Sequence, residues 1–288
     1  MSFSSEIKEE LARHISPARH CQLAELAAIM NFCGQYGRDA EGNYTIGFQT
    51  ENEAVVRKGF TLLQKTYNIK NGAVMNEEQI QAILLKIGDL EEPVNALLVK
   101  NACCQRAFLR GAFLAIGSMS DPNKGYHLEF VCTGKDKAYQ LRSIIQGFDI
   151  EARIVLRKKY HVVYLKEGAA IVDLLNVCEA HCALMNLENL RILKEMRNSI
   201  NRRVNCEAAN ITKTVNAASR QIEDIELIKD RYGLMNLPEG LRQMAEVRLE
   251  NPDAPLKELG ECLSPPVGKS GVNHRLRKLS ELAEKIRT

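Results

Sequence analysis

Two patterns of apolar residues alternate along the first 190 residues, one typical of helices and one of strands. Apolar side chains recur at helical spacing over Cys21–Cys33, Asn52–Tyr67 and Glu77–Ile87. Apolar and polar residues alternate over Asn43–Thr50, which predicts a half-buried strand, and we expect a second, short strand over residues 69–75. This stretch of the chain is therefore predicted to contain both helices and strands.

The same order of elements recurs after an offset of about 80 residues, which indicates an internal repeat. A helix, a strand, a helix, a hairpin and a last helix are predicted in turn over Gln105–Ile116, Tyr126–Cys132, Asp136–Phe148, Ile154–Leu165 and Ala169–Val177. We therefore expect a duplicated α+β domain over residues 1–190, with repeats at about 21–88 and 104–178. Such a duplication tends to have a pseudo-two-fold axis with a seam along it.

The last part of the chain, residues 233–288, has helical patterns only. Helices are predicted over residues 237–250, Leu256–Leu263 and Lys269–Ile286. The third helix has one continuous apolar stripe, formed by Val272, Leu276, Leu279, Ala283 and Ile286. A short helix, a turn and a second helix with a basic N-terminal half are typical of a helix-turn-helix, whose second helix enters the DNA major groove.

Charge is distributed unevenly between these regions. Residues 191–288 carry 18 basic and 14 acidic side chains, whereas residues 1–190 carry 21 and 22. Within a predicted basic helical linker at 191–232, Arg191–Arg220 holds seven bases against two acids, and Cys262–Ser280 holds four bases and no acid. Separate basic patches in a balanced chain favour a polyanionic partner, and solvated helix faces are the alternative.

Length and composition restrict the class of protein. The chain has 288 residues, of which 45% are hydrophobic and 26% charged, as in a globular protein with two folding units. No stretch approaches roughly 18 consecutive apolar residues and the N-terminus lacks an apolar signal core, so neither a membrane span nor export is expected. The nine cysteines include no CxxC pair, which favours reduced thiols in a cytosolic protein.

Two groups of cysteines are candidate reactive or metal-binding sites. Cys178, His181 and Cys182 would share one face of a continuous helix, but a zinc site requires four ligands, so a packed helix is favoured. The pair Cys103 and Cys104 begins a helix, where a thiolate is stabilised, yet a core role is favoured there too. The sequence thus predicts no metal site, no other cofactor and no catalytic residue.

The lead helices of the two repeats resemble each other. Leu26–Gly34 and Leu109–Gly117 each have small residues in the middle and end in a glycine, which suits close helix packing and a left-handed C-cap. Both resemble degenerate copies of the motif of LAGLIDADG homing endonucleases. In that family the motif helices pack along the pseudo-two-fold axis, and the acid before the final glycine holds a divalent metal.

The resemblance to these nucleases implies their fold but not their chemistry. The two acid positions are occupied by Cys33 and Ile116, neither of which can bind Mg²⁺. Asp39 and Asp121 follow each glycine by a few residues, where a role in a solvent-facing turn is the favoured interpretation. We therefore expect a LAGLIDADG-like domain without nuclease activity.

Five segments spread along the chain together resemble the WhiA family, namely Phe108–Leu114, Ser120–Glu129, Asn201–Asn210, Leu256–Gly260 and Lys269–Lys278. This resemblance covers essentially the whole chain. It implies an α+β duplicated LAGLIDADG-like domain followed by an all-α helix-turn-helix domain resembling region 4 of sigma factors. Proteins of the WhiA family are transcription regulators of Gram-positive bacteria, tied to sporulation in some and to cell division and chromosome segregation in others.

The resemblance implies a sequence-specific DNA-binding regulator rather than an enzyme. Lys269, Ser270 and Asn273 are expected near base edges, because the N-terminal residues of such helices face the bases. The other residues expected to contact DNA are His274, Arg275, Arg277, Lys278, Arg202 and Arg203. Two alternatives stay open: a DNA-associated scaffold whose first domain binds a protein, and a residual metal-dependent nuclease.

The expected partner is double-stranded DNA at promoters. A transcription factor or RNA polymerase is an open second partner, and a monomer is compatible with the sequence. We expect the protein in the cytoplasm, associated with the nucleoid.

Overall fold

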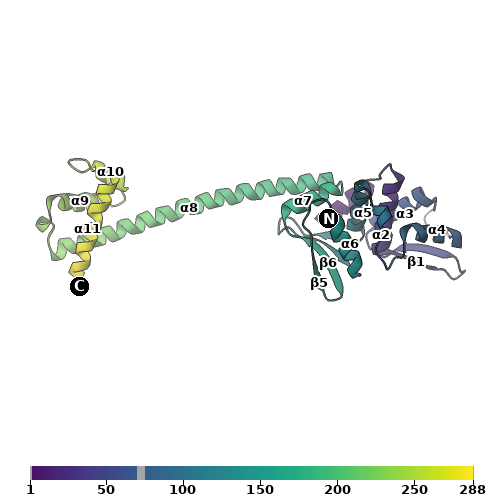
Figure 1. The fold of residues 1–288 in the computed structure, drawn as a ribbon. Coiled ribbons are helices and arrows are strands. Elements are labelled where there is room, and N and C mark those ends of the chain that lie inside the picture. Colours follow the sequence, from purple (N-terminus) through teal and green to yellow (C-terminus); the bar gives the residue numbers. More distant parts are fainter. Residues whose placement is uncertain (1, 70–74, 288) are drawn as a thin grey trace. The chain divides into compact units, whose positions relative to one another are not determined.

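The structure is a computed structural model that describes residues 2–69 and 75–287. It divides into two compact units, Met1–Lys194 and Glu195–Thr288, each with its own hydrophobic core (Figure 1). The strand expected over residues 69–75 lies largely outside the described residues. Among the described residues, no helix has the length and hydropathy needed to cross a bilayer.

The first repeat of the N-terminal unit is built mainly from helices. Its elements are α1 (Phe3–Arg13), α2 (Arg19–Cys33), β1 (Gly34–Arg38), β2 (Tyr44–Phe48), α3 (Glu53–Tyr67) and α4 (Glu77–Ile87). The helices α2, α3 and α4 agree with the sequence pattern, whereas α1 was not predicted. The Asn52 side chain caps α3 by accepting a hydrogen bond from the Ala54 amide at 3.0 Å. β1 and β2 pair antiparallel as a two-stranded sheet.

The second repeat contains the larger sheet. It consists of a short 3₁₀ helix η1 (Ala96–Val99), α5 (Ala102–Ile116), β3 (Gly117–Met119), β4 (Leu128–Cys132), α6 (Lys135–Gln146), β5 (Arg153–Arg157), β6 (Tyr160–Leu165) and α7 (Gly168–Val177). The strands are antiparallel in the order β3-β4-β6-β5. Leu128, Phe130 and Cys132 of β4 point into the core, as their alternation predicted. The duplicated α+β pattern is confirmed.

The lead helices α2 and α5 pack against each other as the seam of this unit (Figure 1). A Cβ atom on Gly111 would lie 2.5 Å from the carbonyl oxygen of Glu25, so only glycine permits this approach. The left-handed C-cap predicted for Gly34 and Gly117 is wrong, since their φ angles are −75° and −77°. Each helix instead passes directly into a strand, where a Cβ on Gly34 would lie 2.5 Å from the Met30 oxygen.

The helix α8 (His181–Arg231) continues from the first unit into the second. Its first turn is capped from α1, because the Glu10 carboxylate accepts hydrogen bonds from the amides of Cys182 at 2.7 Å and Ala183 at 2.9 Å. Its last turns contribute Ile225 and Ile228 to the core of the second unit.

The C-terminal unit gathers its remaining helices around the end of α8 (Figure 1). They are a 3₁₀ helix η2 (Leu234–Asn236), α9 (Glu239–Glu250), α10 (Leu256–Glu261) and α11 (Lys269–Arg287). The predicted stripe of α11 is confirmed, with Val272, Leu276, Leu279 and Ala283 buried and Ile286 half-buried against the same core. This stripe leaves the polar faces of α11 free for other contacts.

Candidate nucleic-acid interface

The turn between α10 and α11 is closed by a tight backbone contact. The Val267 amide donates a hydrogen bond to the carbonyl oxygen of Gly260 at 2.9 Å, and a Cβ on Gly260 would lie 2.0 Å from the Val267 oxygen. A Cβ on Gly271 would lie 2.4 Å from the Val267 side chain. The two glycines therefore let the turn fold back on both helices and fix the start of α11.

The N-terminal half of α11 carries its polar side chains outward. Those that are exposed are Lys269, Ser270, Asn273, His274, Arg277 and Lys278. Arg275 differs, because it is half-buried and donates a hydrogen bond to the Gly240 oxygen at 3.2 Å. The Arg277 guanidinium pairs with the carboxylate of Glu281 at 3.3 Å, with both side chains exposed.

A groove in the C-terminal unit is lined by residues of α8 and α11 and of the chain between them. Its lining comprises Lys213, Thr214, Ala217, Gln221, Arg248, Ala254, Pro255, Leu256, Lys257, Lys269 and Asn273, and it includes no acidic residue. Arg248 is almost fully buried at its edge, where it donates to the Ala254 oxygen at 2.7 Å and burial lowers its pKa. Lys213, Lys257 and Lys269 are exposed, so the groove has an excess of accessible positive charge.

A second hollow of this unit has mixed charge. It is lined by bases and acids of α8 and α11, namely Arg220, Glu223, Asp224, Arg277, Glu281, Glu284 and Arg287. Arg287 pairs with Asp224 at 2.8 Å. In the parts of the chain that the structure describes, no ion pair joins the bases of 191–220 to the acids of 223–226. The groove therefore carries an excess of positive charge, whereas the second hollow does not.

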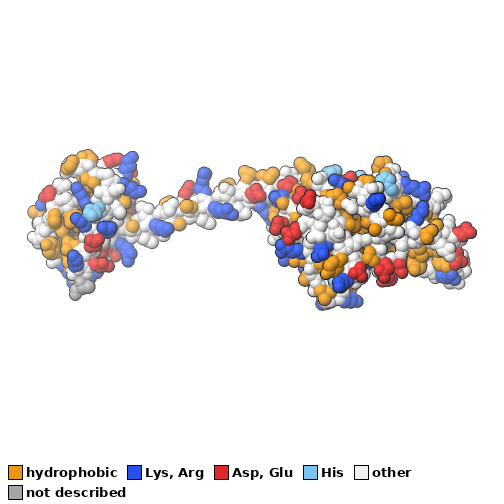
Figure 2. Space-filling view, viewed as in Figure 1, with side chains coloured by type: hydrophobic (Ala, Val, Ile, Leu, Met, Phe, Trp, Pro, Cys, Tyr) orange, Lys and Arg blue, Asp and Glu red, His pale blue; other side chains and the backbone are white. Residues whose placement is uncertain are grey.

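Several basic residues of α8 outside the groove project into solvent (Figure 2). Arg202 and Arg203 are exposed and, within the described residues, have no ion pair or hydrogen bond. Arg191 pairs with Glu188 at 2.7 Å, and the Lys194 amine donates to the Pro122 oxygen. Lys213 is thus the base of the linker stretch that lies with Lys269 in one groove.

The former acid positions of the N-terminal unit hold no metal ligand suited to Mg²⁺. The Cys33 thiol is buried and donates to the Ile29 oxygen at 3.3 Å, and burial raises its pKa to about 12. Ile116 is half-buried against the same core. The structure therefore offers apolar packing at both positions where nucleases of this fold place carboxylates.

The turn role expected for Asp39 and Asp121 is confirmed. The Asp39 carboxylate accepts hydrogen bonds from the amides of Asn43 at 2.8 Å and Glu41 at 2.9 Å, and Asp121 accepts from the amide of Asn123 at 2.9 Å. These backbone hydrogen bonds lower the pKa of both carboxyl groups, because they stabilise the charged form.

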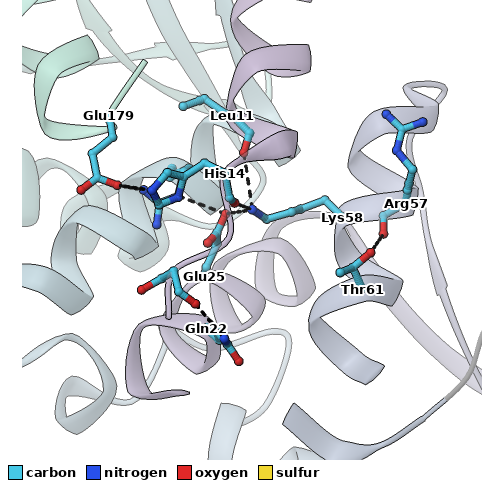
Figure 3. A network of polar contacts seen from close by, with 10 residues as sticks. Leu11, His14, Gln22, Glu25, Arg57, Lys58, Thr61 and Glu179 are labelled. Carbon is cyan, nitrogen blue, oxygen red and sulfur yellow. Dashed lines mark hydrogen bonds and ion pairs between the residues drawn. The ribbon is translucent and has the colours of Figure 1, made fainter. Parts of the chain in front are cut away.

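A network of buried charges beside the seam was missed by the sequence analysis (Figure 3). The fully buried Glu25 carboxylate of α2 pairs with Lys58 of α3 at 2.9 Å and with Arg110 of α5 at 3.2 Å. Arg110 also pairs with Glu179, which contacts the His14 ring at 3.0 Å. The network thus joins five separate segments, the two lead helices among them. The sequence signal for this network is a charged residue within each apolar lead helix, Glu25 in α2 and Arg110 in α5.

The trio of Cys178, His181 and Cys182 is not on one helix. Cys178 ends α7, Glu179 has a left-handed backbone with a φ of 65°, and α8 begins at His181. Among the described residues, these three side chains do not form a group that could hold a metal. The break in the helix explains why their sequence spacing was misleading.

Three family models match successive parts of the chain. They are the WhiA N-terminal LAGLIDADG-like domain at residues 19–79, the WhiA LAGLIDADG-like domain at 105–197 and the WhiA C-terminal HTH domain at 200–283.

Similar proteins match over the full length. A protein of Lachnoclostridium phytofermentans called "Probable cell division protein WhiA" is 53% identical over 312 residues, covering 100% of both chains. A protein of the same name from Alkaliphilus oremlandii is 50% identical and covers 99% of this chain and 98% of its own. The crystal structure of full-length WhiA from Thermatoga maritima matches with a TM-score of 0.59 at 29% identity, covering 99% of each chain. The chain therefore belongs to the WhiA family.

Proposed function

We propose that this protein is a sequence-specific DNA-binding transcription regulator that acts in cell division, chromosome segregation or sporulation. The observation that supports this most strongly is the acid-free groove in which Lys213 and Lys257 lie with Lys269 and Asn273 of α11. Lys257 pairs with the exposed Glu261 at 4.0 Å, whereas Lys213 and Lys269 have no acidic partner among the described residues. Exposed bases attract phosphates, and an Asn side chain can read an adenine. The cell-division names of the full-length relatives support the biological setting.

Within this function the residues of α11 have different roles. Lys269, Ser270 and Asn273 are proposed to face base edges, because the start of a recognition helix enters the major groove first. His274, Arg277 and Lys278 are proposed to bind phosphates, which position the protein without specifying sequence.

The remaining bases would extend the phosphate contacts. Arg275 is also proposed to contact DNA. Its hydrogen bond to the Gly240 oxygen uses only part of its guanidinium, which leaves other N–H groups for a phosphate. Arg202 and Arg203 would add contacts from the predicted linker at 191–232, beside the helix-turn-helix domain at 233–288.

The domain at 1–190 is proposed to have no nuclease activity. Cys33 and Ile116 supply no carboxylate at the positions where a metal would be held, and hard cations require oxygen ligands. Incubating the full chain with Mg²⁺ and supercoiled plasmid should give no nicks. Cleavage that requires Mg²⁺ and is lost on replacing Asp39 or Asp121 would contradict this part of the proposal.

The decisive experiment is a map of genome-wide occupancy in the bacterium that makes the protein, together with binding of the purified chain to the recovered fragments. A regulator should give sharp peaks at promoters, and one shared sequence should bind more tightly than random DNA by roughly 10³-fold or more. Occupancy that spreads without peaks, with equal affinity for all fragments, would favour the DNA-associated scaffold instead.

A further inference from the structure

Four metal-binding side chains meet at one end of the seam between the two repeats. They are His20 and Cys21 in the first turn of α2, and Cys103 and Cys104 in the first turn of α5. The first pair precedes the second by 83 positions, the same offset that separates Gly34 from Gly117 at the other ends of these helices. The four residues therefore occupy equivalent places in the two repeats.

The geometry is close to that of a tetrahedral site. The ligand atoms all lie within 4.8 Å of one another, and the His20 Nδ1 atom lies 3.3 Å from the Cys21 sulfur and 3.2 Å from the Cys104 sulfur. Zinc bonds of about 2.3 Å to sulfur and about 2.0 Å to nitrogen require separations of about 3.8 Å and 3.5 Å between ligand atoms. Shifts of about 1 Å or less would satisfy them.

The surroundings suit metal-bound thiolates with access to solvent, although burial raises the pKa of the free Cys21 and Cys104 thiols. Neither α2 nor α5 has a side-chain N-cap or an acid in its first turn, so the positive ends of both helices face the cysteines uncompensated. Cys21 and Cys104 are buried with Ala24 and Ala107, whereas His20 and Cys103 are exposed. A metal ion can thus enter from the side of the exposed His20 and Cys103 and bind the buried Cys21 and Cys104 on its other side.

We propose that these residues form a structural Zn²⁺ site, with three thiolates and one imidazole, that clamps the two repeats together at the start of the lead helices. Four protein ligands leave no open position, as in structural rather than catalytic zinc sites. Each cysteine releases its proton to the buffer as the metal binds. The site is not evident from the sequence, because each repeat supplies only two adjacent ligands and the other two are far away in the chain.

The test uses the purified full-length chain under reducing conditions, with zinc measured by elemental analysis and Co²⁺ as a spectroscopic probe. The wild type should hold one Zn²⁺ per chain, and Co²⁺ should titrate to the same stoichiometry with the thiolate-to-cobalt absorption of a tetrahedral site. Removing the metal with a chelator should lower the melting temperature, and adding Zn²⁺ should restore it.

Variants locate the site. His20→Ala with Cys103→Ser removes the two exposed ligands without disturbing the core, and this double variant should lose stoichiometric metal. Cys182→Ser with Cys206→Ser alters two exposed thiols elsewhere and should keep it. The proposal is overturned if the wild type binds no stoichiometric metal, if the double variant binds as much as the wild type, or if freshly reduced protein gives no thiolate-to-cobalt absorption.

Discussion

Two groups of charged side chains, one in each unit of this chain, have opposite surroundings. The N-terminal unit buries Glu25, Lys58 and Arg110 in contact with one another, whereas the C-terminal unit keeps Lys213 and Lys269 exposed in a groove without acids. Buried charges are costly to desolvate and need every partner in place, so they fix a particular packing. Exposed bases without partners cost little and stay available for a polyanion. The difference supports a structural role for the first set and agrees with the binding role proposed for the second.

The largest effect should come from breaking the buried network. Replacing Glu25 with Ala leaves Lys58 and Arg110 buried without their shared carboxylate, which should destabilise the N-terminal unit by about 3–5 kcal/mol. Hydrogen exchange of the amides of α2 and α5 measures this loss. Glu51→Ala, at an exposed acid, is the control and should stay within about 0.5 kcal/mol of wild type. A small effect at Glu25 would mean that the network is not structural.

Next in size is the loss of specificity at the recognition helix. Asn273→Ala removes the proposed base contact and should reduce discrimination between operator and random DNA by about 1–3 kcal/mol. Fluorescence anisotropy with both DNAs at one salt concentration measures the ratio of the two affinities. Lys278→Ala, one turn further along α11, is the comparison and should weaken both complexes equally. An unchanged ratio for Asn273→Ala would show that the groove assignment is wrong.

The groove itself can be tested through salt dependence. Each neutralised phosphate contributes about −0.9 to the slope of log affinity against log salt, so Lys213→Ala with Lys257→Ala, the exposed groove bases that are not assigned to base edges, should make the slope shallower by about two units. Lys159→Ala, at an exposed hairpin turn of the N-terminal unit, should leave the slope unchanged. If the double variant kept the full slope, the bases in the groove would be solvated rather than bound to phosphates.

Most long helices were predictable from the sequence, whereas two short strands were not. The helical spacing of apolar residues predicted α3, α4 and α11 nearly to the residue, because each has a long amphipathic face. The strands β1 and β3 were missed, because they are short and begin directly at Gly34 and Gly117, where the pattern suggested helix ends only.

Contacts between distant residues were harder to predict than elements. Glu25 and Arg110 were visible as charges within apolar helices, but their pairing depends on how α2 and α5 pack. Lys213 and Lys269 were each identified as basic, and only the folded unit places them in one groove. Features that depend on a single helix or strand were therefore predictable from the sequence. Contacts between residues far apart in the chain were not.

The smallest predicted effect concerns the exposed ion pair between Arg277 and Glu281 of α11. Two variants of this pair distinguish a role of Arg277 in DNA binding from a role in ordering the helix. Glu281→Gln and Arg277→Gln remove the same exposed ion pair, which should change the stability of the C-terminal unit by no more than about 0.5 kcal/mol in either variant. Their effects on DNA should differ, because Glu281→Gln frees a base near the phosphates, whereas Arg277→Gln removes it. Urea unfolding and anisotropy on the two variants measure both quantities. Equal weakening of DNA binding by both variants would show that the ion pair orders α11, and that Arg277 does not bind phosphate.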